Sequence, residues 1–314
     1  GTQGDSYYIA PNPPFGAVFT YYLSKGFESK LQKRKKKEKS SIDRGKAVGF
    51  PGWNAVEEER REMKPQIILE VKDKEGNTVR RLNGPISKGF HRVAWDLRFP
   101  SPSTISLNNP SMNGSGFLAI PGRYTVSMFS KVDGKLSQLS EPQVFDVVPL
   151  RSGALPTDSF EQISSFWREY EKIAKRASAI QNSVANSLKK IGSMNIALSQ
   201  SNANVGDMDN RLDGLRSNIL EMDEALSGNR SKMGPGEKNN PTVGDRLFVL
   251  QRVIEYSTYG PTETALETLE LVQKDLDKIE NQLNQNNKDL DALARRLEKA
   301  GGPWIEGTPI PKKN

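Results

Sequence analysis

The sequence contains no cysteine and only one histidine, His91, among its 314 residues. The lack of cysteine excludes disulfides, thiolate-bound zinc, iron–sulfur clusters and thiol nucleophiles. The lack of a second histidine excludes His-rich metal sites and any Ser-His-Asp triad built on a residue other than His91. No apolar run approaches the roughly 18 residues that a membrane-spanning helix needs, and residues 1–6 are polar, without the apolar core of a signal peptide. We therefore expect no membrane span.

Basic and acidic residues nearly balance along the chain, except near the N-terminus, where basic residues are in excess. The formal charge is +7, and residues 1–150 hold 23 Lys and Arg against 15 Asp and Glu. Most of this excess lies in residues 30–39, which contain Lys30, Lys33, Arg34, Lys35, Lys36, Lys37 and Lys39. A block of like charge predicts a solvated, mobile segment. Polyanion binding is the alternative, but the run has neither interleaved aromatic residues nor an evident basic face, so nucleic acid is not the expected partner.

Residues 1–150 have the pattern of an all-β domain. Residues 16–23 are β-branched and aromatic, which favours a strand. Strand-like alternation then runs from residue 65 to residue 150, with Ile67, Leu69 and Val71 on one face. Two turn signals punctuate it. In residues 73–77, Gly76-Asn77 supplies positive φ angles after the turn residue Asp73, and Asp133-Gly134 marks a second hairpin. Five to seven short strands of this kind predict a β-sandwich.

One strand of this domain supplies its core anchor. Along residues 90–97 the apolar side chains fall on the odd positions, so Val93, Trp95 and Leu97 should face the core. Residues 25–64 interrupt the strands. They are charged and weakly periodic, except for a short helical stretch rich in glutamate that begins at Trp53. We expect them to form a charged insertion between two strands.

Residues 151–314 change to a period of about three and a half. Thr157, Asp158 or Ser159 is positioned to cap the first helix, Gly228 should end the second, and residues 229–241 are expected to be a flexible loop. The last helix carries apolar residues in a three–four alternation that is typical of a coiled-coil seam, at Leu269, Val272, Leu276, Ile279, Leu283, Leu290, Leu293 and Leu297. Asn286 interrupts this seam, either as a buried register-setting amide or beyond the packed region. The pattern predicts an antiparallel bundle or long helical hairpin, and hence α and β parts in separate domains.

Candidate chemistry is sparse. Residues 234–238, Gly-Pro-Gly-Glu-Lys, have the wrong spacing for a phosphate loop. Glu57, Glu58, Glu59 and Glu62 are expected to pair within their helix, and nothing selects them, or Asp73 and Asp96, as a catalytic carboxylate pair. His91 is expected to be a packed or surface residue, and the sequons at Asn113 and Asn229 matter only on a eukaryotic secretory route. We therefore predict no catalytic residues, no cofactor-binding residues and no metal ligands.

Two sets of residues carry a resemblance to known families. The segments 71–82, 89–96 and 121–126, with Asp73, Gly76, Trp95 and Gly122 in place, resemble the immunoglobulin-like module of the bacterial flagellar hook-capping type. The segments 8–23, 50–53, 95–98, 257–262 and 302–304 resemble the C-terminal region of bacterial sortilin-like, BNR-repeat "glycosyl hydrolase" proteins.

The second resemblance covers most of the chain. It implies an extracytoplasmic protein whose β-propeller precedes this region, because the chain itself has no repeated Asp-box signature (Ser-x-Asp-x-Gly-x-x-Trp). The hydrolase label belongs to that propeller and is itself an analogy. We therefore expect a non-catalytic accessory or protein-interaction region, with the propeller of the same polypeptide or another protein as its partner. The alternatives are a fragment that contributes to a glycoside hydrolase site and a polyanion binder acting through residues 30–39.

Overall fold

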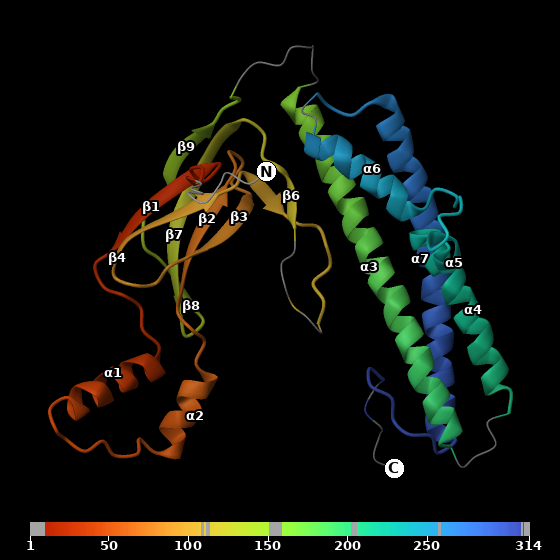
Figure 1. Ribbon diagram of the computed structural model, residues 1–314, viewed down its shortest axis with the longest axis horizontal. Coiled ribbons are helices and arrows are strands. Elements are labelled where there is room, and N and C mark those ends of the chain that lie inside the picture. The colour runs from red at the N-terminus through yellow and green to blue at the C-terminus, as the bar shows by residue number, and fades with distance from the viewer. Residues whose placement is uncertain are drawn as a thin grey trace, which may run out of the picture. The chain divides into compact units, whose positions relative to one another are not determined.

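The computed structural model describes residues 10–107, 110, 114–150, 159–201, 206–256, 259–308 and 310 (Figure 1). It combines an open antiparallel sheet with a long helical region, so the predicted mixture of β and α parts is confirmed. The chain divides into two compact units. One comprises Gly1–Pro100 with Leu118–Ser152, and the other comprises Ser101–Phe117 with Gly153–Asn314.

The first unit contains a five-stranded antiparallel sheet, whose long central strand is β7 (Gly122–Val132). One edge of β7 pairs with β2 (Gln66–Lys72), which in turn pairs with β3 (Thr78–Gly84). The other edge is shared by β8 (Lys135–Gln138) and β9 (Gln143–Val147). The short strand β5 (Arg98–Pro100) also belongs to this unit, whereas the short strand β6 (Ser115–Leu118) belongs mostly to the second unit.

A second, two-stranded antiparallel sheet pairs β1 (Ala17–Leu23) with β4 (Gly89–Trp95). Its inward side chains share one hydrophobic core with the larger sheet, formed by the buried residues Tyr21, Leu23, Ile67, Leu69, Val71, Val79, Trp95, Ala119, Tyr124 and Val126. The alternation predicted for β2 is confirmed, because Ile67, Leu69 and Val71 are all buried.

Trp95 is the centre of this core. Its side chain has no exposed surface, its indole N–H donates to the Arg98 carbonyl oxygen at 3.0 Å, and its ring meets Tyr124 edge to face at 5.5 Å. Val93 and Leu97 are partly buried against the same cluster, so the predicted strand register is confirmed. Gly16 lies beside it with φ +103°, where an added Cβ would lie 1.9 Å from the Trp95 carbonyl oxygen. Only glycine fits there.

The two predicted turns are present, with one correction. Asp133 and Gly134 both have positive φ, as the hairpin signal predicts. In the other turn Gly76 has φ 85°, but the prediction that Asn77 shares a positive φ is wrong. The Asp73 carboxylate instead accepts the Asn77 backbone N–H at 2.8 Å, and this holds Asn77 in an ordinary conformation.

The charged insertion contains two helices, α1 (Lys30–Ile42) and α2 (Trp53–Arg61), which we call the arm. The stretch beginning at Trp53 was predicted as helix, and α2 confirms it. Residues 30–39 are largely exposed to solvent, as expected, but they form helix α1, which the sequence pattern did not predict. Ser29 and Gln32 form a capping box, and straight-chain Lys, Arg, Glu and Gln residues favour helix.

The second unit contains α3 (Phe160–Ser199), α4 (Met208–Ser227), α5 (Arg230–Met233), α6 (Val243–Tyr256) and α7 (Glu263–Lys299). Within it, α3 and α7 pack against each other and both contact α4 and α6 (Figure 1). All eight apolar positions predicted for the seam of α7 are buried. No helix in the described ranges combines the length and apolar composition needed to cross a bilayer.

The ends and the polar interruption of these helices follow from local chemistry. Ser159 caps α3 in a capping box with Gln162, while Thr157 and Asp158 lie outside the described residues. Gly228 ends α4 with φ 87°, as predicted, but the expected loop that follows it contains the short helix α5. Asn286 is buried, and its side-chain N–H donates to the Leu215 carbonyl oxygen at 3.2 Å.

Candidate functional site

The carboxylates and the histidine considered from the sequence serve local structure. The Asp73 carboxylate accepts backbone N–H groups of its own turn, and the Asp96 carboxylate accepts the Arg98 N–H at 3.1 Å. His91 Nε2 lies 2.7 Å from the Ser87 carbonyl oxygen, and its ring packs against Tyr21. In the part of the chain that the structure describes, no group of three or more Asp, Glu, His or Cys residues is arranged to hold a metal ion.

The glutamates of α2 pair in two directions, which corrects the expectation that all pair within the helix. Glu57 accepts hydrogen bonds from Arg60 and Arg61, as predicted. Glu59 instead receives a two-pronged contact from Arg34 of α1, at 2.6 and 2.9 Å. This contact holds the pKa of the Glu59 carboxyl below its usual value. The acidic side chains therefore fasten α1 to α2.

Two further contacts complete this fastening. The Glu62 carboxylate accepts the Lys30 backbone N–H at 2.6 Å, and Lys30 Nζ lies 3.5 Å from the Glu58 carboxylate. Both helices lack a buried residue, so polar contacts and not a core hold the arm together.

Glu70, on β2, is a buried carboxylate that the sequence pattern did not single out. Burial alone would raise its pKa, but hydrogen bonds from Arg81 at 2.6 Å and from Lys72 hold the pKa below its usual value. A fully paired carboxylate on a strand ties neighbouring strands together. It is a poor proton donor at neutral pH.

The segments 234–238 and 229–231 also have structural roles. Gly236 has φ 77°, and the Glu237 N–H donates to the Lys232 carbonyl oxygen, which folds the connector back after α5. Asn229 accepts the Ser231 N–H and caps α5. The other sequon begins at Asn113, which lies outside the described residues.

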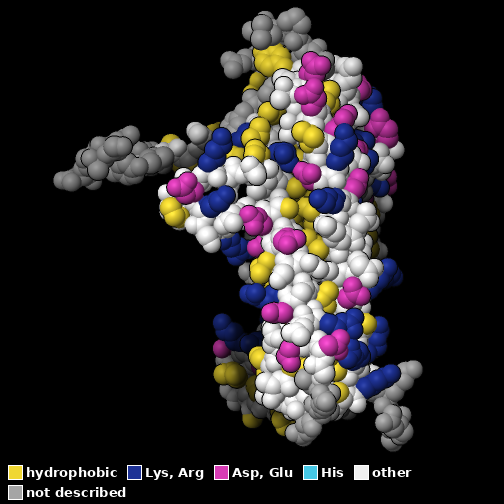
Figure 2. All heavy atoms as spheres, turned by 90° about the vertical axis from the view of Figure 1, so that its right-hand side faces the viewer, with side chains coloured by type: hydrophobic (Ala, Val, Ile, Leu, Met, Phe, Trp, Pro, Cys, Tyr) yellow, Lys and Arg dark blue, Asp and Glu magenta, His cyan; other side chains and the backbone are white. Residues whose placement is uncertain are grey.

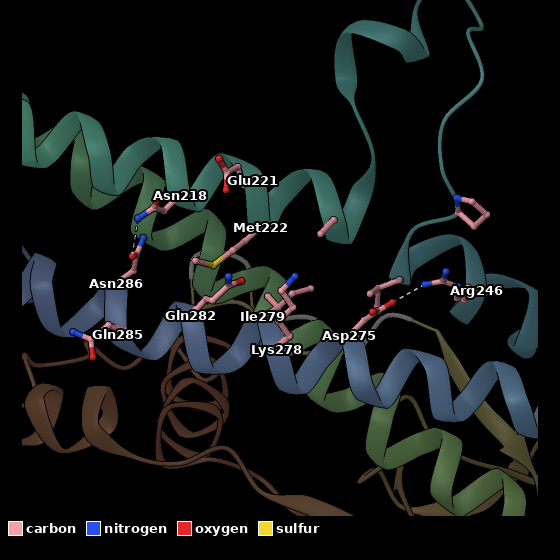
Figure 3. Close-up of a pocket in the computed structure, with 13 residues that line it drawn as sticks. Asn218, Glu221, Met222, Arg246, Asp275, Lys278, Ile279, Gln282, Gln285 and Asn286 are labelled. Carbon is pink, nitrogen blue, oxygen red and sulfur yellow. Dashed lines mark hydrogen bonds and ion pairs between the residues drawn. The ribbon is translucent and has the colours of Figure 1, made fainter.

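A groove of about 550 Å³ lies between α4, α6 and α7 (Figure 3). The Arg246–Asp275 ion pair, at 2.6 Å, stands at one end, and Asn218 and Asn286 approach each other at the other end. Met222 and Ile279 supply apolar lining between them. Half of its polar lining is amide and half is charged, with no histidine or serine among the lining residues, so the groove has the means to hold a polar molecule.

The strands β1 and β4 present an exposed surface that contains aromatic side chains. We call Val18, Thr20, Tyr22, Phe90 and Arg92 the outer β1–β4 face, because they alternate with the core residues of these strands. Tyr22 is 51% exposed and Phe90 is 79% exposed. They are register partners, and their rings lie 4.8 Å apart. Exposed aromatic clusters of this kind mark interaction sites more often than scattered single residues do.

The distribution of charge differs between the two units. On the face of the helical unit shown in Figure 2, basic and acidic side chains are interspersed. On α1, six lysines are exposed, and two of them pair with carboxylates, Lys30 with Glu58 and Lys36 with Glu28. The uneven charge seen in the sequence is therefore concentrated on the arm.

Comparisons with protein-family models, with curated proteins and with solved structures found no match to this chain.

Proposed function

We propose that this chain is a non-catalytic accessory region of a larger secreted protein and that it docks on a neighbouring domain through the outer β1–β4 face. The observation that carries the proposal is the Tyr22–Phe90 pair. Two large aromatic rings in a tilted contact and open to solvent lose apolar exposure when a partner covers them. Tyrosine and other aromatic anchors dominate the binding energy of many protein interfaces.

The partner in this proposal is a β-propeller of the same polypeptide, the domain that precedes this region in the sortilin-like, BNR-repeat proteins that the chain resembles. The first unit would then be an immunoglobulin-like sandwich, an interpretation supported by the core that its two sheets share. The second unit would be an antiparallel bundle, supported by the continuous apolar seam of α7. Such a region would pack against the propeller or space it from other structures.

The alternative of a glycoside hydrolase fragment has less support. A contributed catalytic carboxylate must be free to protonate a glycosidic oxygen or attack the sugar. Asp73 and Asp96 are occupied by backbone N–H groups, and Glu57 and Glu59 are occupied by arginines. For Glu57 and Glu59, the hydrogen bonds from these arginines hold the carboxyl pKa below its usual value.

The experiment separates the propeller from this chain and measures their association by calorimetry. Substitution of both Tyr22 and Phe90 by Ser should weaken the association at least tenfold. The matched control is Val144→Ser on β9, which changes another exposed apolar side chain, 62% exposed, outside the face. Equal affinity of the double variant and the wild-type chain would contradict docking through this face.

A further inference from the structure

The arm carries a second surface, which the docking proposal does not use. At about 100° per residue, five exposed lysines follow one another around about 200° of α1, in the order Lys35, Lys39, Lys36, Lys33 and Lys37. Arg34 and Glu38 occupy the remaining side, where Arg34 meets Glu59 of α2. The helix therefore separates its basic residues into a structural side and a solvent-facing side.

Most of the lysines on the solvent-facing side have no internal partner. Lys36 pairs with Glu28 at 2.9 Å, but Lys33, Lys35, Lys37 and Lys39 form no ion pair with any described residue. Like charges at such spacing repel one another along the helix. An anionic partner would relieve that repulsion.

A hollow of about 780 Å³ lies at the base of the arm, within the same unit, and it extends this basic surface. Lys36 reaches it from α1, Lys25 from the segment after β1, and Lys88 from the connection between β3 and β4. Ser24, Ser87 and Gln32 add hydrogen-bonding groups to its lining, and Phe27 and Ile86 add apolar surface. Three lysines against the single carboxylate of Glu28 give the hollow a net positive charge that suits a phosphate group.

The arm also exposes apolar side chains, and this narrows the class of partner. Phe50 is 64% exposed and Trp53 is 79% exposed, with ring centroids 4.9 Å apart in an edge-to-face contact. Ile42, at the end of α1, and Val48, in the connector between α1 and α2, are exposed as well. A nucleic-acid duplex would satisfy mainly the lysines, because its bases are stacked on one another, whereas the headgroup region of an anionic bilayer accepts both ammonium groups and aromatic rings.

We propose that the arm binds the surface of an anionic phospholipid bilayer. The lysines of α1 lie among the headgroups, the basic hollow holds one lipid phosphate, and Phe50 and Trp53 enter the boundary between headgroups and acyl chains. This is peripheral binding by an insertion of the first unit, and it is independent of the outer β1–β4 face.

The test is co-sedimentation of the full chain with two kinds of vesicle. One contains phosphatidylcholine alone, and the other also contains about 30% of the anionic lipid phosphatidylglycerol. We expect binding only to the anionic vesicles, weakened by salt because the Debye length falls from about 10 Å at 0.1 M to about 3 Å at 1 M. Each lysine near such a surface contributes roughly fivefold in affinity. Substituting Lys33, Lys35, Lys37 and Lys39 by Gln should therefore weaken binding at least tenfold.

Further variants distinguish binding through this surface from a general effect of charge. A control in which Lys175, Lys189, Lys274 and Lys288, exposed lysines of α3 and α7, become Gln makes the same charge change and should bind like the wild-type chain. Phe50→Ser with Trp53→Ser should weaken binding severalfold at unchanged charge, while Phe248→Ser on α6 should not. In the wild-type chain, bound vesicles should shift the Trp53 emission to shorter wavelength, and Trp53→Phe should remove that shift.

Three results would overturn the proposal. The first is no binding to anionic vesicles at 0.1 M salt, and the second is equal loss of binding in the arm variant and the control variant. The third is tighter binding to a duplex oligonucleotide or to polyglutamate than to the vesicles, which would assign the lysines to a nucleic acid or to an acidic protein.

Discussion

Truncation of Trp95 tests the packing of the core of the first unit, which we also call the β-unit. The side chain is fully buried and contacts Tyr124 and Phe145 edge to face, at 5.5 and 6.2 Å. Replacement by Ala removes these contacts and leaves a cavity in the middle of the core. It also leaves the Arg98 carbonyl without the indole N–H. A change of this kind costs about 3–5 kcal/mol, a large part of the roughly 5–15 kcal/mol that stabilises a typical domain.

The assay must report on the β-unit separately, because the chain contains two compact units. Pulsed hydrogen exchange with mass spectrometry at increasing urea gives an unfolding midpoint for peptides from β2 and β7. A loss of about 4 kcal/mol at a slope of about 2 kcal/mol per molar lowers the urea midpoint by about 2 M. Trp53→Ala is the control, since an exposed substitution changes stability by no more than about 0.5 kcal/mol. An unchanged midpoint for β2 and β7 in Trp95→Ala would refute the assigned core.

The remaining predictions concern the helical seam, the arm and catalysis. Leu283→Ala should destabilise the helical unit by about 2–5 kcal/mol, whereas the exposed Lys278→Ala should stay within about 0.5 kcal/mol, and comparable thermal shifts would contradict the seam. The pKa of Glu59 is held below its usual value by hydrogen bonds from Arg34, so this pair holds the arm at neutral pH and is lost as the pH falls through the lowered pKa. Amide exchange in α1 and α2, corrected for intrinsic rates, should therefore become faster on acidification. Arg34→Met should remove that pH dependence. If the corrected exchange rates of the wild-type arm did not change with pH, the role of the pair would be contradicted. The isolated chain should not hydrolyse aryl glycosides, and turnover that a single Asp or Glu substitution abolishes would disprove its non-catalytic assignment.

The elements that could be predicted from the sequence are those in which burial alone sets the pattern. In β2, the buried Ile67, Leu69 and Val71 alternate with Ile68, Glu70 and Lys72, and in α7 the apolar seam runs almost unbroken through Leu276 and Leu283. Both periods follow from having one face in a core, so a single sequence is enough to reveal them.

The elements that could not be predicted depend on contacts between distant residues. Helix α1 has no apolar stripe. Its residue Arg34 pairs with Glu59, which lies 25 residues further along the chain. No local pattern shows which carboxylate a given arginine will meet, so the run looked like a simple block of like charge.

The outer β1–β4 face could not be predicted for a different reason. β1 contains Phe19, Tyr21, Tyr22 and Leu23, and apolar residues therefore point to both sides of the strand. Alternation cannot then distinguish the face that packs on the core from the face that meets solvent. Only the pairing of Tyr22 with Phe90 shows that one of these faces is an exposed aromatic cluster.

The most direct measurement of the proposed docking is hydroxyl-radical footprinting of a longer protein, in which the chain is joined to its proposed propeller, beside the isolated chain. Docking through the outer β1–β4 face predicts that Tyr22 and Phe90 are oxidised at least severalfold more slowly in the longer protein. Phe248, an exposed ring of the helical unit, should react at the same rate in both. Equal oxidation of Tyr22 and Phe90 in the two proteins would show that the face stays open to solvent and would contradict the proposed function.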